Sequence, residues 1–102
     1  MTIENYLKRI KGGIFKLLPL WEEEQSGVDV HLDVYIESLL DEITAAAEIY
    51  PELKDSQNYT RIILTLTRMS TAKDELSFSS WRRKTFKMLS LIDQMRGGNR
   101  YV

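Results

Sequence analysis

Cysteine is absent from this chain of 102 residues, and histidine occurs only once, at position 31. A chain without cysteine forms no disulfide and has no thiolate nucleophile, and one histidine is too few for the usual zinc or iron ligands. The serines have no neighbouring histidine base, so there is no candidate for a catalytic triad. We therefore expect no metal or cofactor, a surface or capping role for His31, and a cytoplasmic protein.

Long apolar runs are also missing. No stretch of about 20 uncharged apolar residues occurs, which predicts that no segment spans a membrane. Charges at Glu4 and Lys8 interrupt the N-terminal segment, so we expect no signal peptide. The pair Gly12-Gly13 lacks the lysine and the preceding strand that a phosphate-binding loop needs.

The apolar residues between positions 32 and 50 recur at alternating steps of three and four, as they do on one face of a helix. Asp29 is placed to cap this helix, and Pro51 ends it because a residue before proline is pushed out of the helical region. We expect this helix to be the central packing element of the fold. Its carboxylates lie outside the apolar stripe, where burial cannot raise a pKa for acid–base catalysis, so we expect no enzyme.

A second apolar stripe runs through residues 3–24, with Thr2 at the expected N-cap position. The stripe keeps its phase through Gly12-Gly13 and Pro19, although both disfavour a helix. Unbroken phase favours one kinked helix and the two breakers favour two short helices; we expect the kinked helix. The glycine pair is a tolerated weak spot, a hinge, or a point where another backbone approaches closely.

A third stripe covers residues 59–69, and Asp55 or Ser56 can cap its helix. The β-branched residues at 62–67 also fit a strand, but a lone strand has no partner elsewhere in the chain, which favours a helix.

Residues 70–77 are expected to form a loop before a fourth stripe at residues 78–95. Ser77 or Ser79 can cap this last helix, and Gly97-Gly98 is placed to end it.

Together the four stripes predict an all-α fold, a small four-helix bundle with short loops and a single domain over residues 1–102. Residues 98–102 are expected to be a frayed tail. In length, composition and helical periodicity the chain resembles bacteriocin immunity proteins and small helical proteins of phages and mobile elements in Gram-positive bacteria. The resemblance involves no motif, so it implies a small helical binding protein and assigns no functional residue.

The charges are divided unevenly along the chain. Residues 1–51 carry 4 basic and 10 acidic side chains, a net charge of −6, whereas residues 52–102 carry 10 basic and 5 acidic ones, a net charge of +5. Either the two halves neutralise each other inside the bundle, which we favour, or the protein has two faces of opposite sign.

Asp33, Glu37 and Asp41 share one ridge of the helix over residues 32–50, because they are four residues apart. This acidic ridge is solvated, neutralised by basic side chains from residues 61–87, or available to a basic partner. We favour solvation and retain the three residues as candidates for partner binding.

The densest basic cluster is Arg82, Arg83, Lys84 and Lys87, beside Trp81. Such a cluster can bind phosphates and is the basis for an alternative function, a nucleic-acid-binding regulator that uses the basic C-terminal half. Helical geometry spreads the four side chains over a broad face, and no helix-turn-helix pattern accompanies them, so we expect a solvated face and no nucleic acid.

Several apolar residues lie outside the stripes: Leu20, Val34, Ile49, Leu64, Phe86 and Leu91. Surplus surface apolar residues favour a protein interface. We expect Leu64, Phe86 and Leu91 to form it, and a homodimer of two copies of the chain is one form that such an interface takes. The overall prediction is a non-enzymatic protein-interaction module, such as an adaptor, inhibitor or immunity-type protein, whose partner is another protein.

Overall fold

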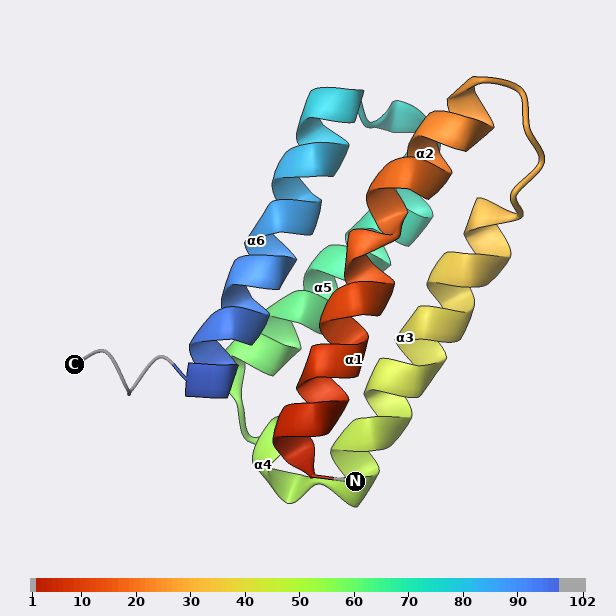
Figure 1. Cartoon of the computed structure of the whole chain (residues 1–102). Coiled ribbons are helices and arrows are strands. Elements are labelled where there is room, and N and C mark those ends of the chain that lie inside the picture. Colours follow the sequence, from red (N-terminus) through yellow and green to blue (C-terminus); the bar gives the residue numbers. More distant parts are fainter. Residues whose placement is uncertain (1, 98–102) are drawn as a thin grey trace.

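The computed structural model describes residues 2–97, and within them the secondary structure is helical throughout. The elements are α1 (Ile3–Phe15), α2 (Leu17–Gln25), α3 (Leu32–Ile49), α4 (Pro51–Lys54), α5 (Gln57–Thr71), the short 3₁₀-helix η1 (Lys73–Glu75) and α6 (Phe78–Gly97). α1 and α2 follow one another end to end and α4 only links α3 to α5 (Figure 1), so the bundle consists of the rods α1 with α2, α3, α5 and α6. The predicted all-α fold is confirmed, and the strand alternative at residues 62–67 is wrong because they lie inside α5. The predicted tail at residues 98–102 lies outside the described residues.

The first rod is interrupted at Lys16, between α1 and α2. The cause is Pro19, which has no N–H to donate to the carbonyl of Phe15 and whose ring crowds that carbonyl. The chain stays close to helical there, since the N–H of Leu20 donates to the carbonyl of Lys16 at 3.1 Å. The expected single kinked helix is therefore wrong, and the alternative of two helices is confirmed, although Gly12-Gly13 continue α1 without a break.

Gly12 is exposed inside α1, and a Cβ added to it would meet nothing within 4 Å. We predict that Gly12→Ala raises the free energy of unfolding by about 0.5–1 kcal/mol, because alanine favours a helix and restricts the unfolded chain. Urea unfolding followed by circular dichroism measures the change. Gly27→Ala is the matched control: Gly27 has a φ of +92°, so alanine there is strained and should destabilise. A destabilised Gly12→Ala variant would show that Gly12 has a role beyond local helix propensity.

The helix α3 begins and ends within one residue of the prediction, but its N-terminus is built differently. His31 occupies the N-cap position in the left-handed conformation, with φ of 51° and ψ of 50°, and its side chain is exposed. The predicted cap, Asp29, lies two positions too early. Its carboxylate accepts a hydrogen bond from the N–H of His31 at 3.3 Å and so stabilises the turn that leads into α3. Pro51 ends α3 and begins α4, where its missing N–H and fixed φ are tolerated.

The predicted cap of α1, Thr2, is confirmed. For α5 and α6 the sequence offered two candidate caps each, and the structure distinguishes them. Ser56 caps α5 in preference to Asp55, and Ser77 precedes α6 in preference to Ser79. In all three caps the side-chain oxygen accepts a hydrogen bond from the N–H three residues later, at 3.1–3.2 Å. These bonds satisfy backbone donors that have no partner within their own helix.

One cluster of buried side chains joins all six α-helices. Its large aromatic members carry polar atoms, and each of those atoms donates to a carbonyl on another helix. The indole of Trp81 donates to Leu17 at 2.9 Å, and the hydroxyl of Tyr59 donates to Ile43. The core therefore holds these polar groups without leaving them unpaired, and the bonds connect α6 to α2 and α5 to α3.

Burial raises the pKa of the Tyr59 phenol well above its ordinary value of about 10, with smaller contributions from Tyr6 and Glu42. The folded protein keeps this phenol neutral at a pH where the unfolded chain ionises it, so stability is lost as the pH rises above about 10.

We predict that the free energy of unfolding falls more steeply between about pH 10 and pH 12 in the wild type than in Tyr59→Phe. One tyrosine contributes up to about 1.4 kcal/mol per pH unit. The variant is about 1 kcal/mol less stable at neutral pH because its hydrogen bond to Ile43 is lost. Urea unfolding across this range measures both slopes, and the remaining ionisable residues are common to the two chains. Equal slopes would contradict the assignment.

Among residues 2–97, no helix has the length and apolar character needed to cross a membrane.

Candidate functional site

The acidic ridge predicted on α3 is exposed, but its three members differ in their surroundings. Asp33 forms an ion pair with Lys73 at 3.0 Å, so neutralisation by residues 61–87 holds for this position. Glu37 and Asp41 have no ion-pair partner among residues 2–97. Within residues 2–97, the carboxylates of the acidic ridge that follow Asp33 are therefore not neutralised by an ion pair.

Lys73 lies between two carboxylates, since it also pairs with Glu24 at 2.9 Å. Burial lowers the pKa of this lysine, but the hydrogen bonds and charges of Glu24 and Asp33 outweigh burial and raise the pKa above its ordinary value. The ammonium group is thus held charged at the point where the end of α2, the start of α3 and η1 meet. Its role is to join these elements.

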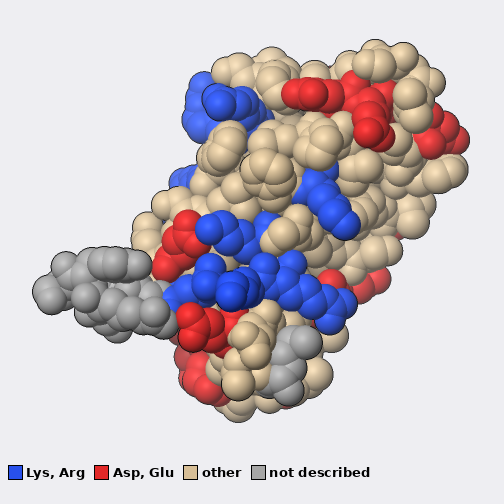
Figure 2. All heavy atoms as spheres, in the orientation of Figure 1, with Lys and Arg blue, Asp and Glu red and all other residues tan. Residues whose placement is uncertain are grey.

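The favoured neutralisation of one half by the other occurs in part, because Lys73 and Arg96 pair with carboxylates of residues 1–51. Acidic α3 and basic α6, however, are not packed side by side. α3 packs closely against α2, α4 and α5 and meets α1 through side chains, whereas α6 packs against α1, α2 and α5. On the face shown in Figure 2, basic and acidic side chains adjoin one another over α1 and the end of α6. The ion pairs Arg9–Glu42 and Lys11–Asp93, both at 2.7 Å, involve α1 and not the basic cluster of α6.

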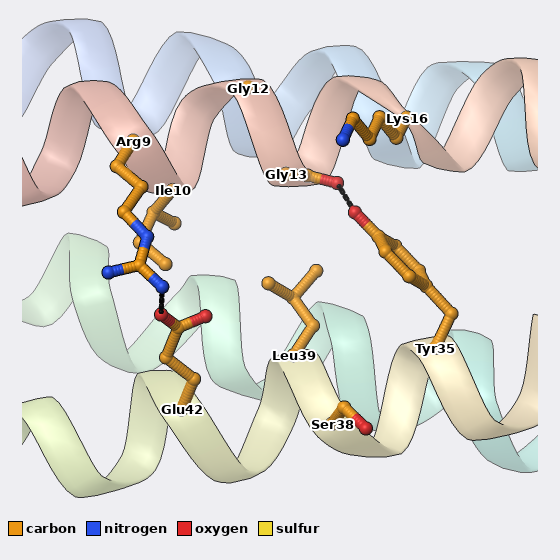
Figure 3. A pocket seen from close by; sticks show the side chains of 9 residues that line it. All are labelled: Arg9, Ile10, Gly12, Gly13, Lys16, Tyr35, Ser38, Leu39 and Glu42. Carbon is orange, nitrogen blue, oxygen red and sulfur yellow. Dashed lines mark hydrogen bonds and ion pairs between the residues drawn. The ribbon is translucent and has the colours of Figure 1, made fainter.

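A groove of about 370 Å³ lies between α1 and α3 (Figure 3). Its polar groups are largely paired with one another: Arg9 contacts Glu42, and the hydroxyl of Tyr35 donates to the carbonyl of Gly13. A Cβ on Gly13 would lie 3.4 Å from Leu39, an ordinary contact, so close approach does not demand glycine here. The contacts across this groove mainly hold α1 and α3 together.

A second groove, of about 390 Å³, lies between α5 and α6 and has the opposite character. It is lined by Arg61, Leu64, Thr65 and Arg68 from α5 and by Lys84 and Lys87 from α6. None of its four cations has a carboxylate partner among residues 2–97. The sequence explains this, because residues 56–73 and 76–92 contain no aspartate or glutamate. We call these six residues the α5/α6 groove.

The structure divides the basic cluster that the sequence suggested. Lys84 and Lys87 line the α5/α6 groove, whereas Arg82 and Arg83 do not. The guanidinium of Arg82 instead lies 4.9 Å from the centre of the Phe86 ring.

Arg61 and Arg68 were missed because they are not contiguous with the cluster. They are seven residues apart, which places them on one face of α5. Together with the lack of acidic residues nearby, that spacing was the available signal.

The apolar interface candidates are also divided. Leu64 is 63% exposed and Phe86 is 42% exposed, as expected for surface residues. Leu91 is 5% exposed and belongs to the core, so its assignment to a partner-binding surface is wrong. The reason is that α6 packs against α5 on one side and α1 and α2 on the other, so it buries a wider stripe than a helix with one neighbour. Among the other off-stripe residues, Val34 and Ile49 are exposed and Leu20 packs against the core.

The four groove cations repel one another, because no carboxylate lies among them. We predict that Lys84→Gln/Lys87→Gln raises the melting temperature by about 2–4 °C at low salt, and that the difference shrinks as salt screens the repulsion. Thermal unfolding at about 10 mM and about 500 mM NaCl measures this. Arg82→Gln/Arg83→Gln has the same change in net charge outside the groove and should change the melting temperature less. A lower melting temperature for the groove variant would mean that unrecognised pairing stabilises these lysines.

Within residues 2–97, no group of three or more histidine, aspartate or glutamate side chains is arranged to hold a metal ion. No protein-family model, curated protein or solved structure matches the chain.

Proposed function

We propose that this chain is a non-enzymatic protein-interaction module that binds an acidic surface of another protein in the α5/α6 groove. The observation that carries the proposal is the group of four cations, Arg61, Arg68, Lys84 and Lys87, which face one groove without a carboxylate partner. Charges of one sign that repel one another in the free protein gain most when an oppositely charged partner covers them.

The groove also has an apolar part, which favours a protein partner. Leu64 lies on α5 between Arg61 and Arg68, and it is largely exposed. A partner helix with acidic residues on one face and an apolar residue among them would cover both kinds of surface.

The groups with raised pKa values lie elsewhere and support the fold. Tyr6, Tyr35 and Tyr59 each donate a hydrogen bond to a carbonyl of a neighbouring helix, and Lys73 joins two carboxylates. None of them lines the α5/α6 groove. This distribution supports binding in preference to catalysis.

The test uses a fluorescein-labelled helical peptide of about 18 residues, with glutamate on one face and a leucine among the glutamates. Fluorescence anisotropy at about 50 mM NaCl should show binding to the wild type. Arg68→Gln/Lys84→Gln should weaken binding about tenfold, because two charge pairs are lost.

The matched control is Arg82→Gln/Arg83→Gln, which removes the same charge from α6 outside the groove. Binding by this variant should stay close to the wild-type value. Equal weakening by both variants, or no binding by the wild type, would contradict the proposal.

The second candidate function is nucleic-acid binding, and the absence of acidic residues around the four cations is what favours it. The same titration with a DNA duplex of about 20 base pairs separates the two. Tighter binding of DNA than of the peptide, with a steep loss of affinity as salt rises, would support the nucleic-acid function instead.

A further inference from the structure

The chain itself presents a helix of the kind that the α5/α6 groove is proposed to bind. On α3, Asp41 and Glu48 are exposed and have no ion-pair partner among residues 2–97. They are seven residues apart, which places them on one face, and Ala45 lies exposed between them. The outer face of α3 is therefore acidic with a small apolar residue at its centre.

The spacings on the two surfaces match when the helices run antiparallel. Along α5, Leu64 is three residues and Arg68 seven residues after Arg61. Along α3 in the opposite direction, Ala45 is three residues and Asp41 seven residues before Glu48. Both helices rise about 1.5 Å per residue, so the two sets of three coincide. This register places Glu48 by Arg61, Ala45 over Leu64, and Asp41 by Arg68.

The second wall of the groove strengthens this register. Asn58 on α5 hydrogen-bonds Gln94 on α6, and the two helices are antiparallel, so the level of Arg68 corresponds to that of Lys84. A carboxylate opposite Arg68 thus lies between two cations of different helices. Asp41 is the residue that the register places there.

The acidic face of α3 cannot reach the groove of its own molecule, since α3 is a packed rod of the same bundle and does not adjoin α6. We infer that a second copy of this chain docks α3 into the α5/α6 groove, with Asp41 and Glu48 paired to the groove cations. The inference rests on the proposed function, because it names an occupant for that same groove.

Such a contact joins two different surfaces, so a pair keeps the groove of one copy and the acidic face of the other copy free. Copies then associate head to tail, and the mass grows with concentration. The contact also covers the groove, so self-association competes with any acidic partner protein.

Two variants that each lose one surface test the inference. Arg68→Gln/Lys84→Gln keeps the acidic face of α3 and loses the groove, whereas Asp41→Asn/Glu48→Gln keeps the groove and loses the acidic face. Sedimentation velocity at about 50 mM NaCl should show that the wild-type mass rises above the chain mass of 11.9 kDa with concentration. Each variant alone should stay at 11.9 kDa. An equal mixture of the two should reach about twice the chain mass and stop there, because the only docked surfaces are one intact groove and one intact α3.

A wild type that stays at the chain mass, or that stops at a dimer at every concentration, would overturn the head-to-tail contact. Variants that keep the wild-type profile would do the same. The labelled acidic peptide distinguishes this failure from failure of the proposed function. If the wild type is monomeric and still binds the peptide through Arg68 and Lys84, only the self-docking is wrong. If it neither associates nor binds the peptide, both proposals are wrong.

Discussion

Replacing Trp81 by alanine is expected to lower the free energy of unfolding by about 3–5 kcal/mol, the usual effect of truncating a fully buried aromatic side chain. Trp81 has no exposed surface, packs near Trp21 with ring centres 6.5 Å apart, and donates its indole N–H to Leu17. A domain of this size has a total stability of about 5–15 kcal/mol, so the variant is expected to be close to unfolding at physiological temperature. Thermal unfolding followed by circular dichroism measures the effect.

Two further variants separate the causes. Trp81→Phe keeps most of the apolar volume but leaves the carbonyl of Leu17 without its donor, so it should lose about 1–3 kcal/mol. Phe86→Ser, on the exposed side of the same helix, should change stability by no more than about 0.5 kcal/mol. A Trp81→Ala variant as stable as Phe86→Ser would show that α6 is not anchored through this residue.

Ile43→Ala is expected to have the second large effect, a loss of about 2–5 kcal/mol. Ile43 lies within α3 and has no exposed surface, and its backbone carbonyl accepts a hydrogen bond from the hydroxyl of Tyr59. The matched control is Val34→Ala on the same helix, where the side chain is 60% exposed and truncation should have little effect. Melting temperatures within about a degree for the two variants would contradict the central position of α3.

The elements that the sequence predicted well are those in which one local signal decides the outcome. The stripe of residues 32–50 has a single period and a proline at its end, and α3 follows it closely. Thr2 and Ser56 carry side chains that satisfy helix N-termini, and both are caps. These features depend on residues within a few positions of one another, so they can be identified without knowing the neighbouring helices.

The features that the sequence did not predict depend on which helices become neighbours. Leu91 was placed on the surface because a helix with one neighbour buries a narrow stripe, whereas α6 packs on two sides. The α5/α6 groove brings Arg68 and Lys84 together across a loop, and no local pattern measures that proximity. The lack of acidic residues in both segments and the seven-residue spacing of Arg61 and Arg68 were visible beforehand.

The central claim is that the α5/α6 groove is the binding surface of this protein. Chemical-shift mapping tests it most directly: the ¹⁵N-labelled chain is titrated with the acidic helical peptide and its amide signals are followed. We predict that the largest shifts occur at residues 61–68 and 84–87, while residues 9–16 and 35–42 around the α1/α3 groove change little. Shifts that gather around the α1/α3 groove, or no shifts at any peptide concentration, would contradict the claim.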